Sequence, residues 1–537
     1  MNKNLIALSM AAVLGLAACD NDTATSTPAE PDKPTVPEQP AGDFTLANQW
    51  FNDGQLVVTD NAARVAELAK GSAKNVILFV GDGMGVSTIT AARIFEGQKL
   101  GYSGEEHKLS FETLPYVGFA KTYNTDAQTP DSAGTMTAMM TGVKTDAGII
   151  NVAEAVERGD CSTVAGHELV SALQLAEEAG MSTGVVSTAR LTHATPAATY
   201  AVAPDRNWEN DTKLPAEATG CKDIASQLID FNYGNGIEVA LGGGRREFLP
   251  STVTDGEGKA GKRGDGRDLT AEWTTKYDNA AYVWDKAGFD AIDAASTDHL
   301  LGLFNSSHMQ YSTDIRDDVA GEPTLAEMTK KSLEILSRND KGYFLMVEAG
   351  RIDHAHHAGN AYRAMEDTLS LAEAVKVAMD NTSAEDTLII VTADHGHVMT
   401  IAGYPTRGNP ILGLVQGNDG RGEPVSGPAL DANGMPYTAV GYYNGMGFAE
   451  FGAGDNRYGM DIDVGRKDLH GVNVQHPDFH QEALIPKDSE SHAGEDVAVF
   501  ARGPGAALVQ GTNEQSLVFH VMNHAADLVG RAEATTK

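Results

Sequence analysis

The stretch YFLMVEAGRIDHAHH, residues Tyr343–His357, decides the fold. Its first five residues are apolar and a glycine stands on either side of them, which is typical of a buried parallel strand that delivers Glu348 at its carboxyl end. Asp353 and His357 are four residues apart, so a helix starting near Asp353 would present both to one Zn2+. The alternative is a polar turn facing solvent. We disfavour it because an acid at a strand end followed by D-H-x-H-H has no role in packing.

Two further apolar runs also end in an acid. Residues 75–80 lead into Asp82 within the turn GDGMG, for which an ordinary tight turn is the alternative, and residues 387–392 lead into Asp394 and His395. Because the carboxyl ends of parallel strands share one edge of a sheet, Asp82, Glu348 and Asp394 are predicted to converge there. The alternation of strands and helices predicts one large α/β domain with insertions.

This predicted edge holds more carboxylates and imidazoles than one cation needs, and their mutual repulsion is tolerable only if metal ions neutralise it. Mixed nitrogen and carboxylate ligands favour Zn2+, whereas an oxygen-only corner favours Mg2+. The candidate ligands are Asp82, Glu348, Asp353, His357, Asp394, His395 and His492.

The string TPDSAGT at residues 129–135 opens a helix of small residues and methionine. Ser132 therefore lies at a helix N-terminus, where free N–H groups and the helix dipole favour an anion. The alternative is that Asp131 or Ser132 is only an N-cap. Arg206, in the polar loop DRNW, is a candidate anion ligand, although most such arginines are surface groups.

The net charge and the N-terminal segment limit the possible functions of the protein and its cellular compartment. The 537 residues carry a formal charge of −34, which argues against binding to nucleic acid or to a membrane surface. Residues 1–18 have the layout of a secretory signal peptide, with an apolar core too short for a transmembrane helix. The string LAAC ending at Cys19 resembles a bacterial lipobox, which implies lipidation of Cys19 and a periplasmic or cell-surface lipoprotein. An ordinary signal peptide is the alternative.

The two remaining cysteines are Cys161 and Cys221, which an exported compartment permits to pair, with two buried thiols as the alternative. Residues 19–43 are rich in Thr, Pro, Glu and Asp and are predicted to form a disordered tether before one globular domain over 44–537. Residues 251–323 are predicted to be a polar excursion with some helix, and about 403–490 a long surface insertion. The histidines of the insertion, among them His480, are predicted to be solvated.

Seven strings then occur in one order: VGDGMG, DSAGT, HATPAATY, RNW, VEAGRIDHAHH, TADHGH and HAGEDVAVFARGP. On these strings the chain resembles an alkaline phosphatase from residue 75 to about 523, and the vertebrate branch more closely than many bacterial members. The resemblance implies a three-layer α/β sandwich around a central, mostly parallel sheet with a large surface insertion. It also implies a homodimer, with the insertion as a candidate contact, although some relatives are monomers.

The resemblance further implies hydrolysis of phosphate monoesters to an alcohol and inorganic phosphate through a phosphoserine on Ser132, with two Zn2+ and one Mg2+. Arg206 matches the arginine that clamps phosphate oxygens. The implied ligand sets are Asp353, His357 and His492 for one zinc, Asp82, Asp394 and His395 for the second, and Asp82, Glu348 and Thr195 for magnesium.

Three more histidines, His193, His354 and His397, are expected beside the metals without ligating them. His193 and His354 stand where many bacterial relatives carry Asp and Lys, so the magnesium corner departs from the bacterial pattern. Cys161 and Cys221 lie where vertebrate relatives have a disulfide.

Two rival functions are weighed. A phosphodiesterase, sulfatase or cofactor-independent mutase shares the two-metal design, but DSAGT is not the C-x-P-x-R-like motif of a sulfatase, and Glu348, Thr195 and Arg206 together favour a monoester. A lipoprotein that binds phosphate or zinc without turnover would have no use for Ser132 at a helix terminus. We therefore expect phosphomonoesters and phosphate as partners, no nucleic acid, and a membrane reached only through the lipid on Cys19.

Overall fold

The computed structural model describes residues 48–65, 72–447 and 466–536. The predicted signal peptide (1–18), the lipidated Cys19 and the tether (19–43) lie outside the described residues, and they stay predictions. Among the helices of the described part, none is both long and apolar enough to cross a membrane.

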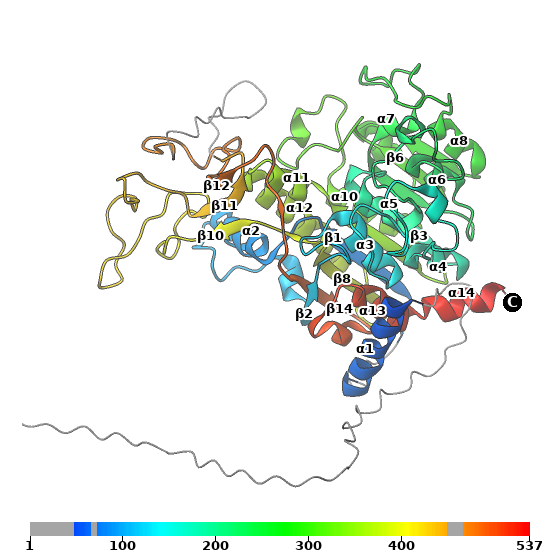
Figure 1. The fold of residues 1–537 in the computed structure, drawn as a ribbon, viewed down its shortest axis with the longest axis horizontal. Coiled ribbons are helices and arrows are strands. Elements are labelled where there is room, and N and C mark those ends of the chain that lie inside the picture. The colour runs from blue at the N-terminus through cyan, green and yellow to red at the C-terminus, as the bar shows by residue number, and fades with distance from the viewer. Residues whose placement is uncertain (1–47, 66–71, 448–465, 537) are drawn as a thin grey trace, which may run out of the picture. The chain divides into compact units, whose positions relative to one another are not determined.

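A ten-stranded sheet forms the centre of the domain (Figure 1). Among its strands, β14 alone runs antiparallel to its two neighbours, β8 and β2, and the other pairings are parallel. The predicted α/β fold with a mostly parallel sheet is confirmed. In spatial order the strands are β15 (Gly511–Glu514), β2 (Tyr116–Lys121), β14 (Val497–Arg502), β8 (Thr387–Ala393), β1 (Asn75–Gly81), β7 (Tyr343–Ala349), β3 (Ser182–Arg190), β4 (Val239–Gly243), β6 (His299–Leu303) and β5 (Ala280–Val283).

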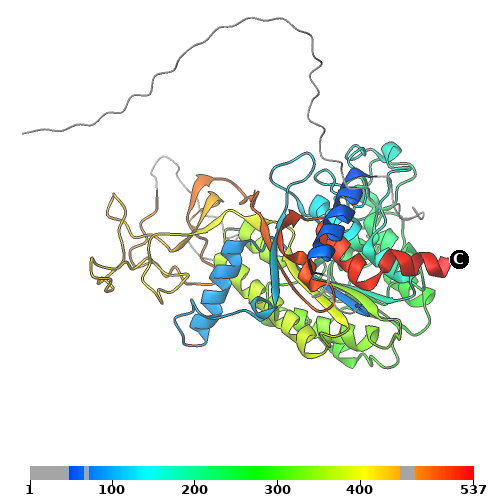
Figure 2. The ribbon, with the colours of Figure 1, turned by 90° about the horizontal axis from the view of Figure 1, so that it is seen from below.

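Helices pack on both sides of this sheet (Figures 1 and 2). One layer comprises α2 (Val86–Lys99), α10 (Leu325–Leu336), α11 (Arg351–His357) and α12 (Ala361–Asp380). The other comprises α1 (Gln49–Val65), α3 (Ser132–Thr141), α4 (Ala172–Glu178), α5 (Ala194–Tyr200), α13 (Leu517–Ala526) and α14 (Leu528–Thr536). Every residue of β1, β7 and β8 is buried between the layers, which explains why these strands read as continuous apolar runs instead of alternating ones.

The expectation of a polar excursion over 251–323 is wrong in part. This segment contains α8 (Leu269–Lys276) and α9 (Lys286–Ala291) as well as β5 and β6, which extend the central sheet to its edge. All five residues of β6 are buried. The two strands are only four and five residues long and stand among polar residues, so their periodicity is too short to recognise.

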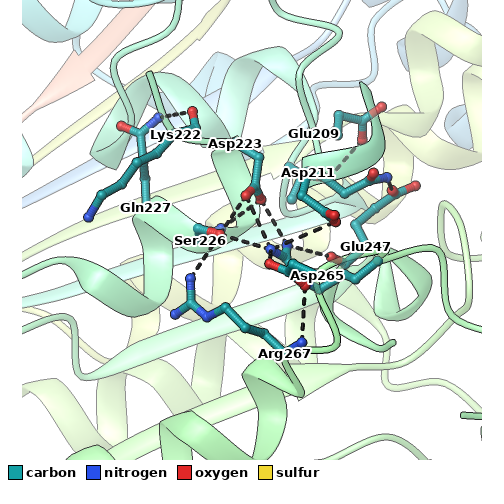
Figure 3. A network of polar contacts seen from close by, with 12 residues as sticks. Glu209, Asp211, Lys222, Asp223, Ser226, Gln227, Glu247, Asp265 and Arg267 are labelled. Atoms are coloured by element: carbon teal, nitrogen blue, oxygen red, sulfur yellow. Dashed lines mark hydrogen bonds and ion pairs between the residues drawn. The ribbon is translucent and has the colours of Figure 1, made fainter. Parts of the chain in front are cut away.

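A buried arginine holds the start of this segment against α6 (Ile224–Asp230), which lies near α7 (Arg245–Phe248). The Arg263 guanidinium is fully buried and donates to Asp223 at 2.9 and 3.2 Å, to Asp265 at 2.5 Å and to the Ser226 hydroxyl at 3.0 Å. Figure 3 shows Asp223, Ser226 and Asp265 turned toward one another in this network. Nearby in sequence, Cys221 is joined to Cys161 by a disulfide.

The predicted insertion contributes a second, smaller sheet. In this sheet β11 (Val440–Gly445) is the central strand, and it pairs with β10 (Met399–Ile401) on one side and with β12 (Ala483–Pro486) on the other. Just before and after the insertion, β9 (Gly396–His397) pairs with β13 (His492–Ala493), so that His397 lies opposite His492. The expectation that His480 is solvated is wrong: its ring is buried, and Nδ1 donates to the carbonyl oxygen of Ala358 at 2.5 Å.

Candidate active site

Three acids lie at one edge of the sheet, as the strand pattern predicts. Strand β1 lies between β7 and β8, with Val80 opposite Glu348 and Gly81 opposite Ala393, so Asp82 and Asp394 directly follow adjacent strand ends. The acids Asp82, Glu348 and Asp394 are all fully buried. Parallel pairing thus brings three carboxylates from distant parts of the chain to one place.

Gly83 makes room at this edge. Its φ of +73° lies in the left-handed region, and a Cβ there would stand 2.4 Å from the His397 ring. Its N–H donates to Asp394 Oδ1 at 3.0 Å. The glycine therefore both turns the chain after β1 and fixes one of the carboxylates.

Asp82, Asp394 and His395 form the first ligand cluster. His395 Nε2 lies 3.5 Å from Asp82 Oδ1 and 3.3 Å from Asp394 Oδ2. Both Asp82 oxygens and Asp394 Oδ2 are buried without a hydrogen-bond partner. Burial and the neighbouring carboxylates raise the pKa of Asp82 well above its usual value, and burial raises that of Asp394. A cation fits this set, because it would satisfy the bare oxygens and offset their charge.

Asp353, His357 and His492 form the second cluster. Helix α11 begins at Arg351, so Asp353 and His357 share a face as predicted. His357 Nδ1 donates to the Glu490 carbonyl at 2.5 Å and His492 Nδ1 to the Pro130 carbonyl at 2.8 Å, which leaves both Nε2 atoms as acceptors.

The acceptor atoms of this second cluster face one another directly. The two Nε2 atoms lie 3.1 Å apart, and each lies 3.3 Å from Asp353 Oδ1. Three acceptors at this spacing, with no proton to share among them, also fit a metal ion.

His397 belongs to a different arrangement. Its Nε2 lies 2.8 Å from Asp353 Oδ1 and its Nδ1 2.5 Å from Glu490 Oε2. Both neighbours are acceptors, so both ring nitrogens donate, and the two carboxylates raise the pKa of His397 to about 10 against the opposing effect of burial. A ring that donates from both nitrogens has no lone pair for a metal.

Glu348, Thr195 and His193 form a third corner with Asp82. Ligand atoms of Asp82, His193 and Glu348 lie within 4.8 Å of one another. Burial raises the pKa of Glu348 to about 7, while the hydrogen bond from Ser187 acts in the other direction. Glu348 Oε1 and the Thr195 hydroxyl are buried without a hydrogen-bond partner, which fits an oxygen-rich cation site.

Ser132 lies beside the first cluster at the start of α3. Its Oγ is 3.3 Å from His395 Nε2, and the residue is buried. Asp131 is the N-cap, since its Oδ1 accepts from the Gly134 N–H at 3.1 Å. The Ser132 hydroxyl is therefore not used in capping and remains available for chemistry.

Arg206 lies in a loop, and its side chain contacts Asp131, the residue before Ser132. Its Nη1 donates to Asp131 Oδ2 at 2.9 Å, and its Nη2 lies 3.2 Å from His193 Nε2. The ring of His354 lies 5.5 Å from that of His193 and 4.0 Å from that of His308. The predicted site residues thus form one continuous group at the sheet edge.

Four contributors were not predicted: Asp131 as the partner of Arg206, Ser187, His308 and Glu490. Ser187 donates to Glu348 from the adjacent strand, and it could have been suspected as a polar residue within the apolar run of β3. Glu490 stands two residues before His492. For His308 no local sequence signal exists, because its place depends on how the 251–323 segment packs.

Comparisons with known proteins show the family to which the chain belongs. The family model described as alkaline phosphatase matches residues 73–528. The tissue-nonspecific alkaline phosphatase of Rattus norvegicus is 43% identical over 487 residues, covering 89% of this chain and 88% of that protein. The membrane-bound alkaline phosphatase of Bombyx mori is 41% identical over 491 residues, covering 89% of this chain and 85% of that protein.

Solved structures agree on the fold. The alkaline phosphatase of Thermus thermophilus superposes with a TM-score of 0.60 at 24% identity, covering 87% of this chain and 96% of that chain. That of the Antarctic bacterium TAB5 gives a TM-score of 0.57 at 21% identity, covering 86% and 99%. Because the family match and the vertebrate relatives extend over most of its length, the chain belongs to the alkaline phosphatase family, on its vertebrate-like branch, and is an enzyme that hydrolyses phosphate monoesters.

Proposed function

We propose that the enzyme acts through a phosphoserine on Ser132, with two Zn2+ and one Mg2+ at the sheet edge. The zinc ligands are Asp353, His357 and His492 in one site and Asp82, Asp394 and His395 in the other, and the magnesium ligands are Asp82, Glu348 and Thr195. Bound ions would supply the positive charge that activates the nucleophile and water and offsets charge on the phosphoryl and leaving oxygens.

Ser132, Arg206 and Asp131 have separate roles in the proposed reaction. Ser132 Oγ attacks phosphorus in line, forming the Oγ–P bond as the ester P–O bond breaks, and the proton lost by the serine balances the one gained by the leaving alcohol. Water then attacks the phosphoserine, releasing inorganic phosphate and restoring the hydroxyl. Arg206 holds two phosphoryl oxygens through its fork of N–H groups, and Asp131 keeps that fork in place.

The observation that carries the proposal is the contact of Ser132 Oγ with His395 Nε2 at 3.3 Å, at the start of α3 and beside the first cluster. The test is hydrolysis of an aryl phosphate by Ser132→Ala, together with acid trapping of a labelled phosphoenzyme. Both signals should fall to background. Ser171→Ala is the matched control, because Ser171 is also buried and caps the start of α4. Unchanged turnover in Ser132→Ala would refute the proposal.

Metal content provides a separate test. The purified protein should contain two zinc ions and one magnesium ion per chain, lose phosphatase activity after chelation, and regain it when Zn2+ and Mg2+ are restored together. A chain that stays active with no bound metal contradicts the assignment.

We also propose that the enzyme is exported, anchored by lipid on Cys19, and dimeric. The supports are the apolar core of residues 1–18, the LAAC string and the family resemblance. Cys19→Ala should move the enzyme from the membrane to the soluble fraction, and light scattering should give twice the mass of the chain.

A further inference from the structure

Glu490 is a buried acid that lies beside the proposed metal ligands without being one of them. The residue is 1% exposed. Its carboxylate accepts twice, from His397 Nδ1 through Oε2 at 2.5 Å and from the Val398 N–H through Oε1 at 2.8 Å. A buried carboxylate whose two oxygens are both used is held in one orientation.

The backbone of Glu490 makes a second pair of contacts, to a different histidine. Its carbonyl accepts from His357 Nδ1 at 2.5 Å, and its N–H donates to the carbonyl oxygen of His357 at 2.9 Å. Gly445, with φ +136°, leaves room for this, because a Cβ there would stand 3.1 Å from Glu490 Cβ. One residue thus holds the outer nitrogens of two imidazoles.

The inner nitrogens of both imidazoles face one atom. His397 Nε2 lies 2.8 Å from Asp353 Oδ1 and His357 Nε2 lies 3.3 Å from the same oxygen. A hydrogen bond at Nδ1 fixes which nitrogen carries the proton and how the ring is turned, and such partners of metal-binding histidines contribute strongly to metal affinity.

We propose that Glu490 is a positioning residue for the zinc site of Asp353, His357 and His492. Its carboxylate orients the His397 ring, which in turn holds the Asp353 carboxylate, while its carbonyl sets the tautomer of His357. This inference rests on the zinc assignment of the proposed function. A role limited to holding the insertion against the domain predicts a different result, namely lower stability with unchanged zinc affinity.

The first experiment measures zinc affinity by competition with a chromogenic chelator for wild type, Glu490→Gln and Glu490→Ala. We expect zinc to bind about 10- to 100-fold more weakly in Glu490→Ala, with Glu490→Gln in between because its amide oxygen still accepts from Nδ1. Glu322→Gln is the matched control: Glu322 is 2% exposed and likewise accepts one side-chain and one backbone N–H, from Asn305 and Gln310. Its zinc affinity should equal that of wild type.

A double-mutant cycle tests the route through His397. If Glu490 acts through the His397 ring, the loss of zinc affinity caused by Glu490→Gln should be at least several-fold smaller in a His397→Gln background than in wild type. The effects of Glu322→Gln and His397→Gln on zinc affinity should instead be additive. In proton NMR, the far-downfield signal of the ring N–H bonded to Glu490 should be present in wild type and absent in Glu490→Ala.

Thermal unfolding separates these effects from misfolding. Should Glu490→Ala fail to fold, Glu490→Gln and the cycle still decide the matter. Equal zinc affinities for wild type and Glu490→Gln, or strict additivity with His397→Gln, overturn the inference while leaving the proposed function intact. A wild-type protein that binds no zinc overturns both.

Discussion

Arg206 and Asp131 form a partly buried ion pair at the N-terminus of α3, with Nη1 donating to Oδ2 at 2.9 Å. The other oxygen of the carboxylate, Oδ1, accepts from the N–H groups of Gly134 and Gly148 at 3.1 and 3.0 Å. Although burial acts to raise it, these groups lower the pKa of Asp131, so the acid stays ionised. The N-cap of α3 therefore also orients Arg206, which is the arginine proposed to bind phosphate.

Asp131→Ala should weaken inhibition by inorganic phosphate about 3- to 10-fold, because Arg206 loses the partner that fixes its fork. It should also cost about 1 kcal/mol of stability through the lost cap. Asp223→Ala is the matched control, since Asp223 caps α6 and pairs with Arg263, yet lies outside the site. Phosphate inhibition and unfolding should be measured for both variants. An equal effect on phosphate in the control would contradict this prediction.

Arg206→Lys should lower kcat/KM by about 100-fold, with KM and kcat both affected, since an ammonium cannot give the bidentate contact of a guanidinium. Steady-state kinetics with an aryl phosphate provide the measurement. Arg363→Lys is the control, because Arg363 is similarly buried and paired, with Asp314 and Asp478, but belongs to α12. Near-normal kinetics in Arg206→Lys would contradict this prediction, because they would mean that a positive charge at position 206 is enough and the bidentate contact is not needed.

Arg263→Met should destabilise the fold by about 3–5 kcal/mol, since it leaves Asp223 and Asp265 near each other with no buried cation between them. Denaturant unfolding at fixed zinc concentration measures this. Arg267→Met is the comparison, because Arg267 is one-third exposed and its ion pairs are expected to contribute less than about 1 kcal/mol. Equal losses in the two variants would show that burial of Arg263 does not matter.

We expect His520 to make the free energy of unfolding decrease as the pH falls into the acid range. Burial lowers its pKa from 6.5 to about 4, so the folded chain binds this proton less readily than the unfolded chain. The stabilising contribution is complete above pH 6.5 and is lost as pH falls toward 4, amounting to about 3 kcal/mol. His520→Phe should flatten the stability profile in that window while keeping a ring against Phe51 and Phe519.

His524→Phe is the control for that experiment. The spacing of His520 and His524 suggests that both pack on one face of the terminal helix, but His520 is buried and His524 is exposed. The profile of His524→Phe should match that of wild type. A slope that persists in His520→Phe would place the responsible group elsewhere.

Much of the fold could be predicted because short stretches of sequence have the apolar patterns typical of buried strands. The apolar runs that become β1, β7 and β8 each end at an acid, and parallel pairing then requires these acids to meet. The strands β5 and β6 could not be predicted, because four or five residues give no reliable period and their burial comes only from joining a sheet that already exists.

The sequence by itself determined which residue types stand at the sheet edge and therefore that cations fit there, and the family resemblance added the phosphate ester. Only the tertiary structure decided which imidazole nitrogens face inward, that Asp131 and not Ser132 caps α3, and that Glu490 holds two histidines from its far end of the insertion. The physical reason is the separation in sequence between the residues that interact. Strand ends follow from neighbours in sequence, whereas a ring orientation depends on a hydrogen-bond partner up to 362 residues away, for which the chain carries no periodic signal.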